Sequence, residues 1–330
     1  MRKLNKMTIA VLSAAMMITL GGMTTVSADD SVELTMTAGL TTEHIITTMG
    51  NEFADKVAEA TNGEVTIKFY PGDTLGNSSE RAQMLIAGDI DIDVQALSAF
   101  DSYNPRQGVI NAFFMFENWD HYRKFTDSDL YDEIIQGLED TIHVINLGDV
   151  YYAKRNFLST KPIESLEDLK GMKFRVPNEE MPIACIGALG AAPTPMAGSE
   201  VYTSLQNKTI EATENGAEQI VAQAFYEVAP YMTRTAHQYQ TMNFLMSEAG
   251  REKLTDEQFE TISTVFDEIV EKYDTLCQES EAENEKILEE KITVSDIDLT
   301  NFYAAMEPVY SEYDSVWGEG CWQEIKAMAG

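Results

Sequence analysis

The chain has few basic residues, and this shortage excludes two classes of partner. Its 23 Lys and Arg residues face 55 Asp and Glu residues, which gives a formal net charge of −32 at pH 7. A protein that binds nucleic acid needs a basic surface, so we expect no nucleic acid as a partner. Anionic membranes are disfavoured for the same reason. An acidic protein that binds an anion must gather its few cations locally, so each inward-facing arginine becomes a candidate for ligand binding.

Cysteine and histidine are also scarce. The three cysteines, Cys185, Cys277 and Cys321, are too few and too far apart for disulfides to define the fold, although Cys277 could pair with Cys321. The chain has no CxxC, HExxH or Cys/His cluster, so we expect no metal site and no cofactor. It also lacks a GxSxG motif and a Cys/His nucleophile pair, so we predict no catalytic residues and no enzymatic activity.

Long apolar runs are confined to the N-terminus. Three basic residues, Arg2, Lys3 and Lys6, precede an apolar stretch at 7–20, and small residues lead up to Ala28. This is the pattern of a secretory signal peptide, residues 1–28, so we expect cleavage after Ala28 and a location outside the cytoplasm, in the periplasm or at the cell exterior. A membrane anchor is the alternative, but the apolar stretch is short and contains Thr and Ser. The rest of the sequence has no run of about 18 apolar residues that could span a bilayer.

Strand and helix patterns alternate along the mature chain. The first set is predicted as strand 32–38, helix 44–60, strand 65–70, helix 79–87 and strand 90–94. A second alternating set, between residues 172 and 228, has the same organisation. We therefore predict an α/β fold with two lobes. Lobe I comprises 29–152 with about 241–280, and lobe II comprises 153–240 with about 281–330.

A long helix is predicted to connect the two lobes. Thr255 and Gln258 form a capping box at its start, and apolar residues keep helical spacing from Phe259 to Cys277. Polar residues continue the pattern to Lys291, so the helix would measure on the order of 50 Å, more than the width of one lobe. The alternative is two helices separated near Ser280.

Three aspartates alternate with isoleucines in the stretch Asp89-Ile-Asp-Ile-Asp93. The alternation places the three carboxylates on one face of a strand. The stretch lacks the glycine and the distal glutamate of an EF-hand calcium loop. We therefore expect a solvent-exposed face and not a cation site.

Arg175 is the first candidate for ligand binding. It lies at the carboxyl end of the strand 172–176, which Pro177 terminates. In open α/β sheets ligands bind at this end of the strands, and a guanidinium can hold a carboxylate there through two parallel hydrogen bonds. Arg155 follows strand patterns at 142–146 and 150–153, and Asn215 follows one at 209–213. Each alone could be a surface or turn residue, but together they can converge on one crevice.

Several motifs occur at a spacing that is typical of one protein family. The motifs include Gly171-Met-Lys-Phe-Arg-Val-Pro-Asn178, Pro193-Thr-Pro-Met196, Glu200-Val-Tyr202 and Glu214-Asn215. With them the mature chain resembles, end to end, the extracytoplasmic solute-binding subunit of TRAP transporters, the tripartite ATP-independent periplasmic transporters of the dicarboxylate-binding (DctP) type. The resemblance implies a periplasmic-binding-protein-like fold with a ligand cleft between the lobes.

The resemblance also implies which residues bind the ligand. The lobes would close on an organic acid whose carboxylate is held by Arg175 and Asn215, with Arg155 as a second basic position, and deliver it to the TRAP membrane permease subunits. Other positions that match pocket-lining loops are Tyr202, Gln95, His44 and Asn77. The chain departs from the family at Gly216, where proline is usual, and at Gly198, where an aromatic ring is frequent. Specificity is therefore expected to depart from the family there.

The sequence leaves two other functions open. The protein could be a secreted enzyme acting on anionic small molecules, or the ligand-binding module of a sensory system. The ligand itself is also open, because sugar acids, C4-dicarboxylates, keto acids and aromatic acids all present a carboxylate. The oligomeric state is not indicated.

Overall fold

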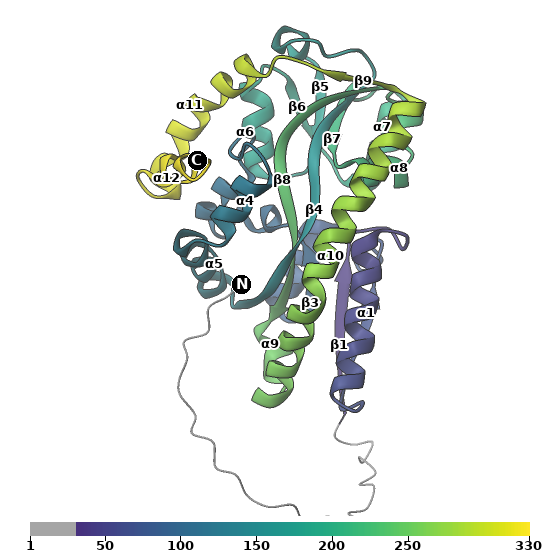
Figure 1. The fold of residues 1–330 in the computed structure, drawn as a ribbon, viewed down its shortest axis with the longest axis vertical. Helices are drawn as coiled ribbons and strands as arrows, with labels where there is room; N and C mark the ends of the chain where they lie inside the picture. Colours follow the sequence, from purple (N-terminus) through teal and green to yellow (C-terminus); the bar gives the residue numbers. More distant parts are fainter. Residues whose placement is uncertain (1–30) are drawn as a thin grey trace, which may run out of the picture.

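The computed structural model describes residues 31–330, so the predicted signal peptide, residues 1–28, lies outside the described residues. The described chain forms two lobes that follow one another along the longest axis of the molecule (Figure 1). Two long strands, β4 (Val144–Ser159) and β8 (Tyr231–Ser247), run from one lobe into the other. Between residues 31 and 330, no helix is both long and apolar enough to cross a membrane.

One nine-stranded sheet extends through both lobes. Its order is β2-β1-β3-β8-β4-β7-β5-β6, and β9 pairs with β8. The shorter strands are β1 (Val32–Ala38), β2 (Val65–Tyr70), β3 (Ile92–Gln95), β5 (Lys173–Val176), β6 (Ala192–Pro195), β7 (Ala212–Asn215) and β9 (Thr293–Asp296). Strand β1 is parallel to β2 and β3, and β5 is parallel to β6 and β7. We call the part around β1–β3 lobe I and the part around β5–β7 lobe II.

Helices cover both faces of the sheet. The α-helices are α1 (Ile45–Ala60), α2 (Ser78–Ala87), α3 (Gly108–Asn111), α4 (Trp119–Thr126), α5 (Asp129–Ile142), α6 (Glu180–Ala188), α7 (Val201–Gln206), α8 (Ala217–Ala222), α9 (Glu248–Glu252), α10 (Asp256–Lys291), α11 (Thr300–Trp317) and α12 (Cys321–Ala327). Short 3₁₀ turns are η1 (Leu97–Phe100), η2 (Pro105–Gln107), η3 (Leu166–Leu169), η4 (Gly198–Glu200) and η5 (Phe225–Glu227). The predicted two-lobed α/β fold is thus confirmed.

Helix α10 is continuous over 36 residues, so the alternative of two helices separated near Ser280 is wrong. It packs on α1 of lobe I, on β4 and on α8 of lobe II (Figure 1). Two of its carboxylates also fix β4. Asp274 accepts a hydrogen bond from the backbone N–H of Tyr151 at 2.6 Å, and Glu281 accepts one from the Tyr151 hydroxyl at 2.5 Å. The helix therefore contacts both lobes and the strand that connects them.

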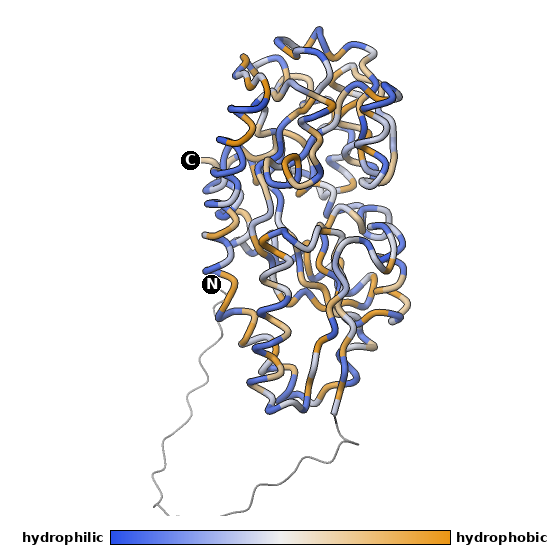
Figure 2. Tube along the Cα trace, turned by 90° about the vertical axis from the view of Figure 1, so that its right-hand side faces the viewer, coloured by the Kyte–Doolittle hydropathy of each residue, from blue (hydrophilic) through white to orange (hydrophobic). Residues whose placement is uncertain are grey.

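The apolar interior consists of three clusters. One lies in lobe I between the sheet, α1 and α10, around Phe53, Phe244 and Phe266. A second lies in lobe II under α7, α8 and the end of α10. The third and largest lies on the opposite face, where α11 and α12 pack beside α5 and α6. Figure 2 shows the two lobes from the side, with hydrophobic and hydrophilic segments interspersed along the trace.

The strands that connect the two lobes are longer than the sequence patterns predicted. Instead of separate strands at 142–146 and 150–153, the structure has the single strand β4, and Arg155 lies within it and not after it. Likewise Asn215 is the last residue of β7, not a turn residue after a strand at 209–213. The reason is tertiary pairing, because β4 pairs with β8 through three register shifts and Asn215 of β7 pairs with Asn156 of β4.

The predicted solvent-exposed face of the Asp89–Asp93 stretch is wrong for two of its three carboxylates. Asp91 and Asp93 are buried, whereas Asp89 is exposed. Asp91 accepts a hydrogen bond from the backbone N–H of Thr35 at 2.8 Å and pairs with Lys253, with Nζ–Oδ1 2.7 Å. Asp93 accepts a hydrogen bond from Arg81 Nε at 3.1 Å. A buried carboxylate needs such partners, which the local pattern does not reveal.

The structure settles the open question about the cysteines. Cys277 and Cys321 are both buried and free, so they do not pair with each other.

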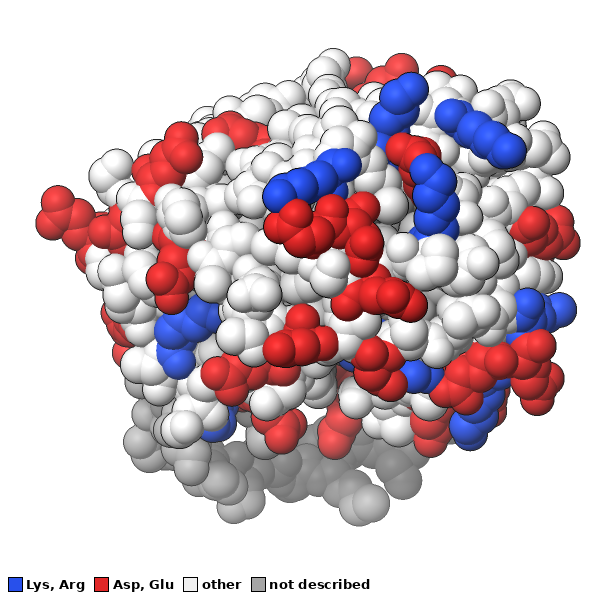
Figure 3. All heavy atoms as spheres, turned by 90° about the horizontal axis from the view of Figure 1, so that it is seen from above, with Lys and Arg blue, Asp and Glu red and all other residues white. Residues whose placement is uncertain are grey.

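The acidic side chains are distributed over the surface. They are spread over the face seen from above in Figure 3, and several lie next to a basic side chain.

Candidate ligand-binding site

Arg175 lies in β5 of lobe II and is buried, with 7 % of its surface exposed. Its Nε and Nη2 donate hydrogen bonds to the backbone oxygen of Met196, at 3.2 and 2.9 Å. Among the described residues its Nη1 has no hydrogen-bond partner, and no carboxylate lies within ion-pair distance. Burial lowers the pKa of Arg175, and nearby Glu214 partly offsets this. Arg175 is therefore a positioned guanidinium with donor capacity left for an anion.

Arg155 has a different environment, because its guanidinium is already paired. Its Nε and Nη2 both donate to the carboxylate of Glu214, the latter at 2.7 Å, and its Nη1 donates to Gln240 Oε1 at 2.8 Å. Burial alone would lower the pKa of Arg155 and raise that of Glu214. Their mutual attraction outweighs burial, so the arginine pKa is raised and the carboxyl pKa is lowered. Arg155 therefore lies beside the candidate site as half of a buried ion pair.

His237 completes this group. Its Nε2 lies 3.4 Å from Glu214 Oε2, and its Nδ1 lies 2.8 Å from the hydroxyl of Thr235. Burial lowers the pKa of His237, and Glu214 opposes part of that shift. We therefore treat it as a neutral side chain that supports the Arg155–Glu214 pair. No role was predicted for Glu214 or His237 from the sequence, although Glu214 directly precedes the predicted Asn215.

Asn215 lies at the carboxyl end of β7, at the same edge of the sheet as Arg175, because Ala212 of β7 is aligned with Phe174 of β5. Its Oδ1 accepts hydrogen bonds from the hydroxyl of Tyr152 at 3.0 Å and from the backbone N–H of Gly216 at 2.9 Å. These bonds fix the amide so that Nδ2 has no partner among residues 31–330. Asn215 thus offers a second free donor at this edge.

The two glycines at which the chain departs from the family have different surroundings. A Cβ atom at Gly216 would lie 2.3 Å from Ala153 Cβ, so this position has no room for a side chain. A Cβ atom at Gly198 would meet nothing closer than Arg175 Nη2 at 4.0 Å. Gly216 is therefore required by packing, whereas Gly198 leaves open space beside the arginine.

His44 is brought to the site from lobe I. It caps α1, with Nδ1 accepting from the backbone N–H of Ile46 at 3.1 Å, and its ring stacks on Tyr152 with centroids 5.6 Å apart. Its Nε2 lies 3.6 Å from Oε2 of Glu218 in lobe II. Burial lowers the pKa of His44 to about 4, so the ring is neutral near pH 7. His44 therefore contacts the residue that positions Asn215.

Three other predicted residues have partners elsewhere. Gln95 is buried and accepts from Arg81 Nη2 at 3.2 Å, while its Nε2 has no partner among the described residues. Asn77 is exposed and caps α2 by accepting from the backbone N–H of Glu80 at 3.1 Å. The hydroxyl of Tyr202 donates to Glu227 at 3.0 Å. Within residues 31–330, no hydrogen bond, ion pair or ring contact joins these three to Arg175.

Sequence reasoning also missed Glu179, which follows β5 and precedes the first residue of α6. It is partly buried. Burial raises the pKa of Glu179, while Ser98 and the nearby Arg175 act in the opposite direction. In a chain with 55 acidic residues, one more glutamate after a strand carried no signal.

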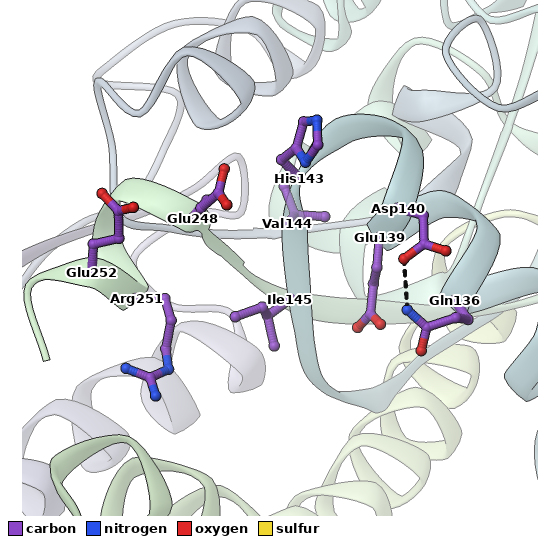
Figure 4. Close-up of a pocket in the computed structure, with 9 residues that line it drawn as sticks. All are labelled: Gln136, Glu139, Asp140, His143, Val144, Ile145, Glu248, Arg251 and Glu252. Carbon is purple, nitrogen blue, oxygen red and sulfur yellow. Dashed lines mark hydrogen bonds between the residues drawn. The ribbon is translucent and has the colours of Figure 1, made fainter. Parts of the chain in front are cut away.

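Two surface hollows lie away from these residues. The larger, of about 680 Å³, is lined by the end of α5, the start of β4 and α9 (Figure 4). The smaller, of about 320 Å³, lies between the end of α1 and the start of α10. Neither is lined by a predicted site residue. Among the described residues there is also no cluster of three His, Cys, Asp or Glu side chains that could hold a metal ion.

The geometry of the fold and of the candidate site defines a class of protein. Two α/β lobes share one sheet, a long helix braces both, and a buried arginine with free donor capacity lies at the carboxyl ends of the lobe II strands. This is the architecture of a two-lobed solute-binding protein, in which ligands bind at the strand ends.

Comparison with known proteins identifies the family. The model of the family "Bacterial extracellular solute-binding protein, family 7" (DctP) matches residues 36–315, and the chain belongs to this family. The chain is 30 % identical to the sialic acid-binding periplasmic protein SiaP of Vibrio cholerae over 330 residues, covering 99 % of this chain and 100 % of SiaP.

Two solved structures of TRAP periplasmic solute-binding proteins share the fold. One, from Pseudomonas putida F1 with bound D-glucuronate, has 25 % identity and a TM-score of 0.85, over 90 % of this chain and 97 % of that chain. The other, from Actinobacillus succinogenes 130z with bound L-galactonate, has 29 % identity and a TM-score of 0.85, over 90 % of this chain and 99 % of that chain. The predicted family is thus confirmed.

Proposed function

We propose that this protein captures an organic acid outside the cytoplasm and that Arg175 and Asn215 hold the acid's carboxylate. The observation that carries the proposal is the free donor capacity of Arg175, a buried guanidinium without a carboxylate partner within 4 Å among residues 31–330. Desolvating such a cation is costly unless an anion compensates it. A ligand carboxylate would provide that compensation and would receive charge-assisted hydrogen bonds.

The nature of the acid follows from the relatives and from the charges at the site. The two structural neighbours hold D-glucuronate and L-galactonate, and the V. cholerae relative is named for sialic acid, so a sugar acid is the ligand class that we infer. Arg155 is neutralised by Glu214, and burial lowers the pKa of His44 and of His237. Arg175 is thus the one cation of this group left for a ligand, which suits a single carboxylate.

Ligand binding would be coupled to closure of the two lobes. A ligand that contacts both lobes favours the closed form and shifts the population towards it. With the predicted lobe boundaries, the chain would pass from one lobe to the other in the middle of β4, at 152/153, and in the middle of β8, at 240/241. The part of α10 before about residue 280 would belong to lobe I and the rest to lobe II. After export and cleavage of the signal peptide, the closed protein would deliver the acid to the membrane permease subunits of a TRAP transporter.

The test is isothermal titration calorimetry of the chain without residues 1–28, using D-glucuronate, D-galacturonate, L-galactonate, sialic acid and succinate. We expect at least one sugar acid to bind, and Arg175→Ala to weaken that binding by about 100-fold, since a bond between charged groups is lost. Lys161→Ala is the matched control, because Lys161 is an exposed cation of lobe II that pairs with Glu211. Unchanged affinity of Arg175→Ala would contradict the proposal.

A further inference from the structure

Tyr152 lies in the middle of β4, the strand that runs from one lobe into the other, and it has no partner in β8. Tyr151 is aligned with Thr241 of β8 and Ala153 with Gln240, so Tyr152 is the extra residue of a β-bulge. A bulge interrupts the strand pairing and re-aims side chains. The direction of the Tyr152 side chain is therefore set by the bulge and not by the regular alternation of β4.

Helix α10 holds this bulge in place. The backbone N–H of Tyr151 donates to Asp274 at 2.6 Å, and that of Lys154 donates to Glu281 at 2.7 Å. Both carboxylates belong to α10, which packs on β4 and contacts both lobes. Backbone groups on either side of Tyr152 thus have their partners in the helix. The bulge is therefore a fixed feature of this strand.

The Tyr152 hydroxyl reaches the candidate carboxylate site. It lies 3.0 Å from Asn215 Oδ1, which also accepts the backbone N–H of Gly216 at 2.9 Å. A backbone N–H can only donate, so its amide partner is the oxygen, and the Tyr152 hydroxyl must then be the second donor to that oxygen. Burial raises the pKa of Tyr152 to about 12, so the hydroxyl keeps its proton near pH 7. With both donors on Oδ1, the amide nitrogen Nδ2 is left to donate to a ligand.

The ring of Tyr152 is in contact with lobe I. It stacks on the ring of His44, with the centroids 5.6 Å apart and the planes inclined by 23°. His44 is the N-cap of α1 in lobe I, whereas Asn215 is the last residue of β7 in lobe II. Tyr152 is buried, so both contacts lie away from bulk water. One side chain therefore contacts lobe I with its ring and the candidate ligand donor of lobe II with its hydroxyl.

We propose that Tyr152 is a positioning residue that makes carboxylate binding at Asn215 depend on the contact between the two lobes. The stacked His44 ring holds the Tyr152 ring, and the Tyr152 hydroxyl then holds the Asn215 amide with Nδ2 free for the ligand's carboxylate. When the lobes separate and the stacking is lost, the amide is less firmly oriented and binds the carboxylate less well. The proposal rests on the proposed function, since it needs an acid held by Arg175 and Asn215.

The experiment is a double-mutant cycle on ligand affinity. D-Glucuronate, D-galacturonate, L-galactonate and sialic acid are titrated by calorimetry into the wild type, Tyr152→Phe, Asn215→Ala and the double variant. We expect Tyr152→Phe to weaken binding about 3- to 10-fold, the effect of one neutral hydrogen bond. In the Asn215→Ala background the same substitution should change the affinity by less than about 1.5-fold, because the amide that the hydroxyl orients is gone.

A second cycle tests the contribution of lobe I. His44→Asn removes the ring but keeps an N-cap acceptor for α1. We expect it to weaken binding about 2- to 5-fold in the otherwise wild-type protein. In Tyr152→Phe it should have a smaller effect, because no hydroxyl is left to be held on Asn215. An equal effect of His44→Asn in both backgrounds would show that the His44 ring acts independently of this hydroxyl, and would overturn the proposal.

Tyr151→Phe is the matched control, because Tyr151 is the neighbouring tyrosine of β4 and its hydroxyl donates to Glu281 of α10 and not to Asn215. It should change the affinity by the same factor with and without the Asn215 side chain. If Tyr152→Phe behaves in this way too, its role is purely structural and the proposal is overturned. A Tyr152→Phe variant that binds the acids as tightly as the wild type would overturn it as well.

The outcomes also distinguish this proposal from the proposed function. If the wild type binds none of the acids of the panel, the proposed function fails and this proposal fails with it. If the acids bind and Arg175→Ala weakens their binding, but the two cycles show no coupling, the proposed function stands and only the role of Tyr152 fails.

Discussion

Glu218 of lobe II accepts a hydrogen bond from the backbone N–H of Ile45, the first residue of α1 in lobe I, at 3.0 Å. A carboxylate at a helix N-terminus is favourable, because the first N–H groups have no partner within the helix and the helix dipole is positive there. The same carboxylate lies 3.6 Å from His44 Nε2. Glu218 therefore connects the two lobes at the edge of the candidate site.

Removing this connection should make the ligand-free protein more open. We expect Glu218→Ala to shift the equilibrium between closed and open forms by about 1–3 kcal/mol towards the open one, because a partly buried charged hydrogen bond is lost. Small-angle X-ray scattering would show a larger radius of gyration. Glu218→Gln, which keeps an acceptor for Ile45, should stay close to the wild type. Identical scattering for the alanine variant would contradict the role of this contact.

We expect the protein to lose stability when one partner of the buried Arg155–Glu214 ion pair is removed. Arg155→Met should destabilise the protein by about 3–5 kcal/mol, since it leaves the Glu214 carboxylate buried without its cation. The double variant Arg155→Met/Glu214→Leu should recover most of this loss, because apolar groups of similar volume can replace a buried ion pair. Urea denaturation measures both. A double variant as unstable as the single one would show that the pair itself, and not the orphaned charge, provides the stability.

The close approach of Gly216 to Ala153 predicts a pair of compensating substitutions. Gly216→Ala should cost about 1–3 kcal/mol through overpacking, since its Cβ would lie 2.3 Å from Ala153 Cβ. Ala153→Gly in the same chain should restore much of the stability. The backbone N–H of Gly216 also orients Asn215, so the single variant should bind acids more weakly. Thermal unfolding and calorimetry test the two effects, and a fully stable Gly216→Ala would show that this packing is not tight in solution.

His44 predicts a pH dependence of stability. Burial lowers the pKa of His44 to about 4, below its ordinary value of 6.5. Between these two pH values the folded state binds fewer protons than the unfolded state. The contribution of His44 to the free energy of unfolding is therefore complete above pH 6.5 and is lost as the pH falls towards 4. The loss amounts to about 3 kcal/mol at most. His44→Asn keeps an N-cap acceptor without titrating, so its stability should fall less in this range.

The measurement for His44 is the urea midpoint of the wild type and the variant at pH 7.5 and pH 4.5. The comparison with the variant matters, because burial raises the pKa of the facing Glu218, which makes an opposite contribution. Parallel pH profiles for the two proteins would contradict the assignment to His44.

Much of the fold follows from local patterns in the sequence. The lobe I helices, the strand around Phe174, the break at Pro177 and the long helix from Thr255 depend on apolar periodicity, capping residues and proline. These interactions act between residues close in the chain. The sequence also carries the family motifs, which gave the two-lobed architecture and the solute-binding function.

Other features could not be predicted from the sequence, because they depend on contacts between segments that are far apart in the chain. Asp91 and Asp93 have the spacing of an exposed strand face, yet Lys253 and Arg81 compensate them in the interior. Arg155 looks like Arg175 in the sequence, each near the end of a predicted strand. Only the pairing of β4 with β7 places Glu214 against Arg155 and not against Arg175.

The sequence by itself determined the class of protein and its principal candidate, Arg175, because helix and strand periodicity and the spacing of motifs are local properties. The tertiary structure decided which charges remain free. The free energy of a buried charge depends on the partners that the fold brings within a few ångströms of it, whatever their separation along the chain. That is why Arg175 Nη1 has no hydrogen-bond partner among residues 31–330, while the guanidinium of Arg155, only 20 positions earlier in the chain, is already bonded to Glu214 and Gln240.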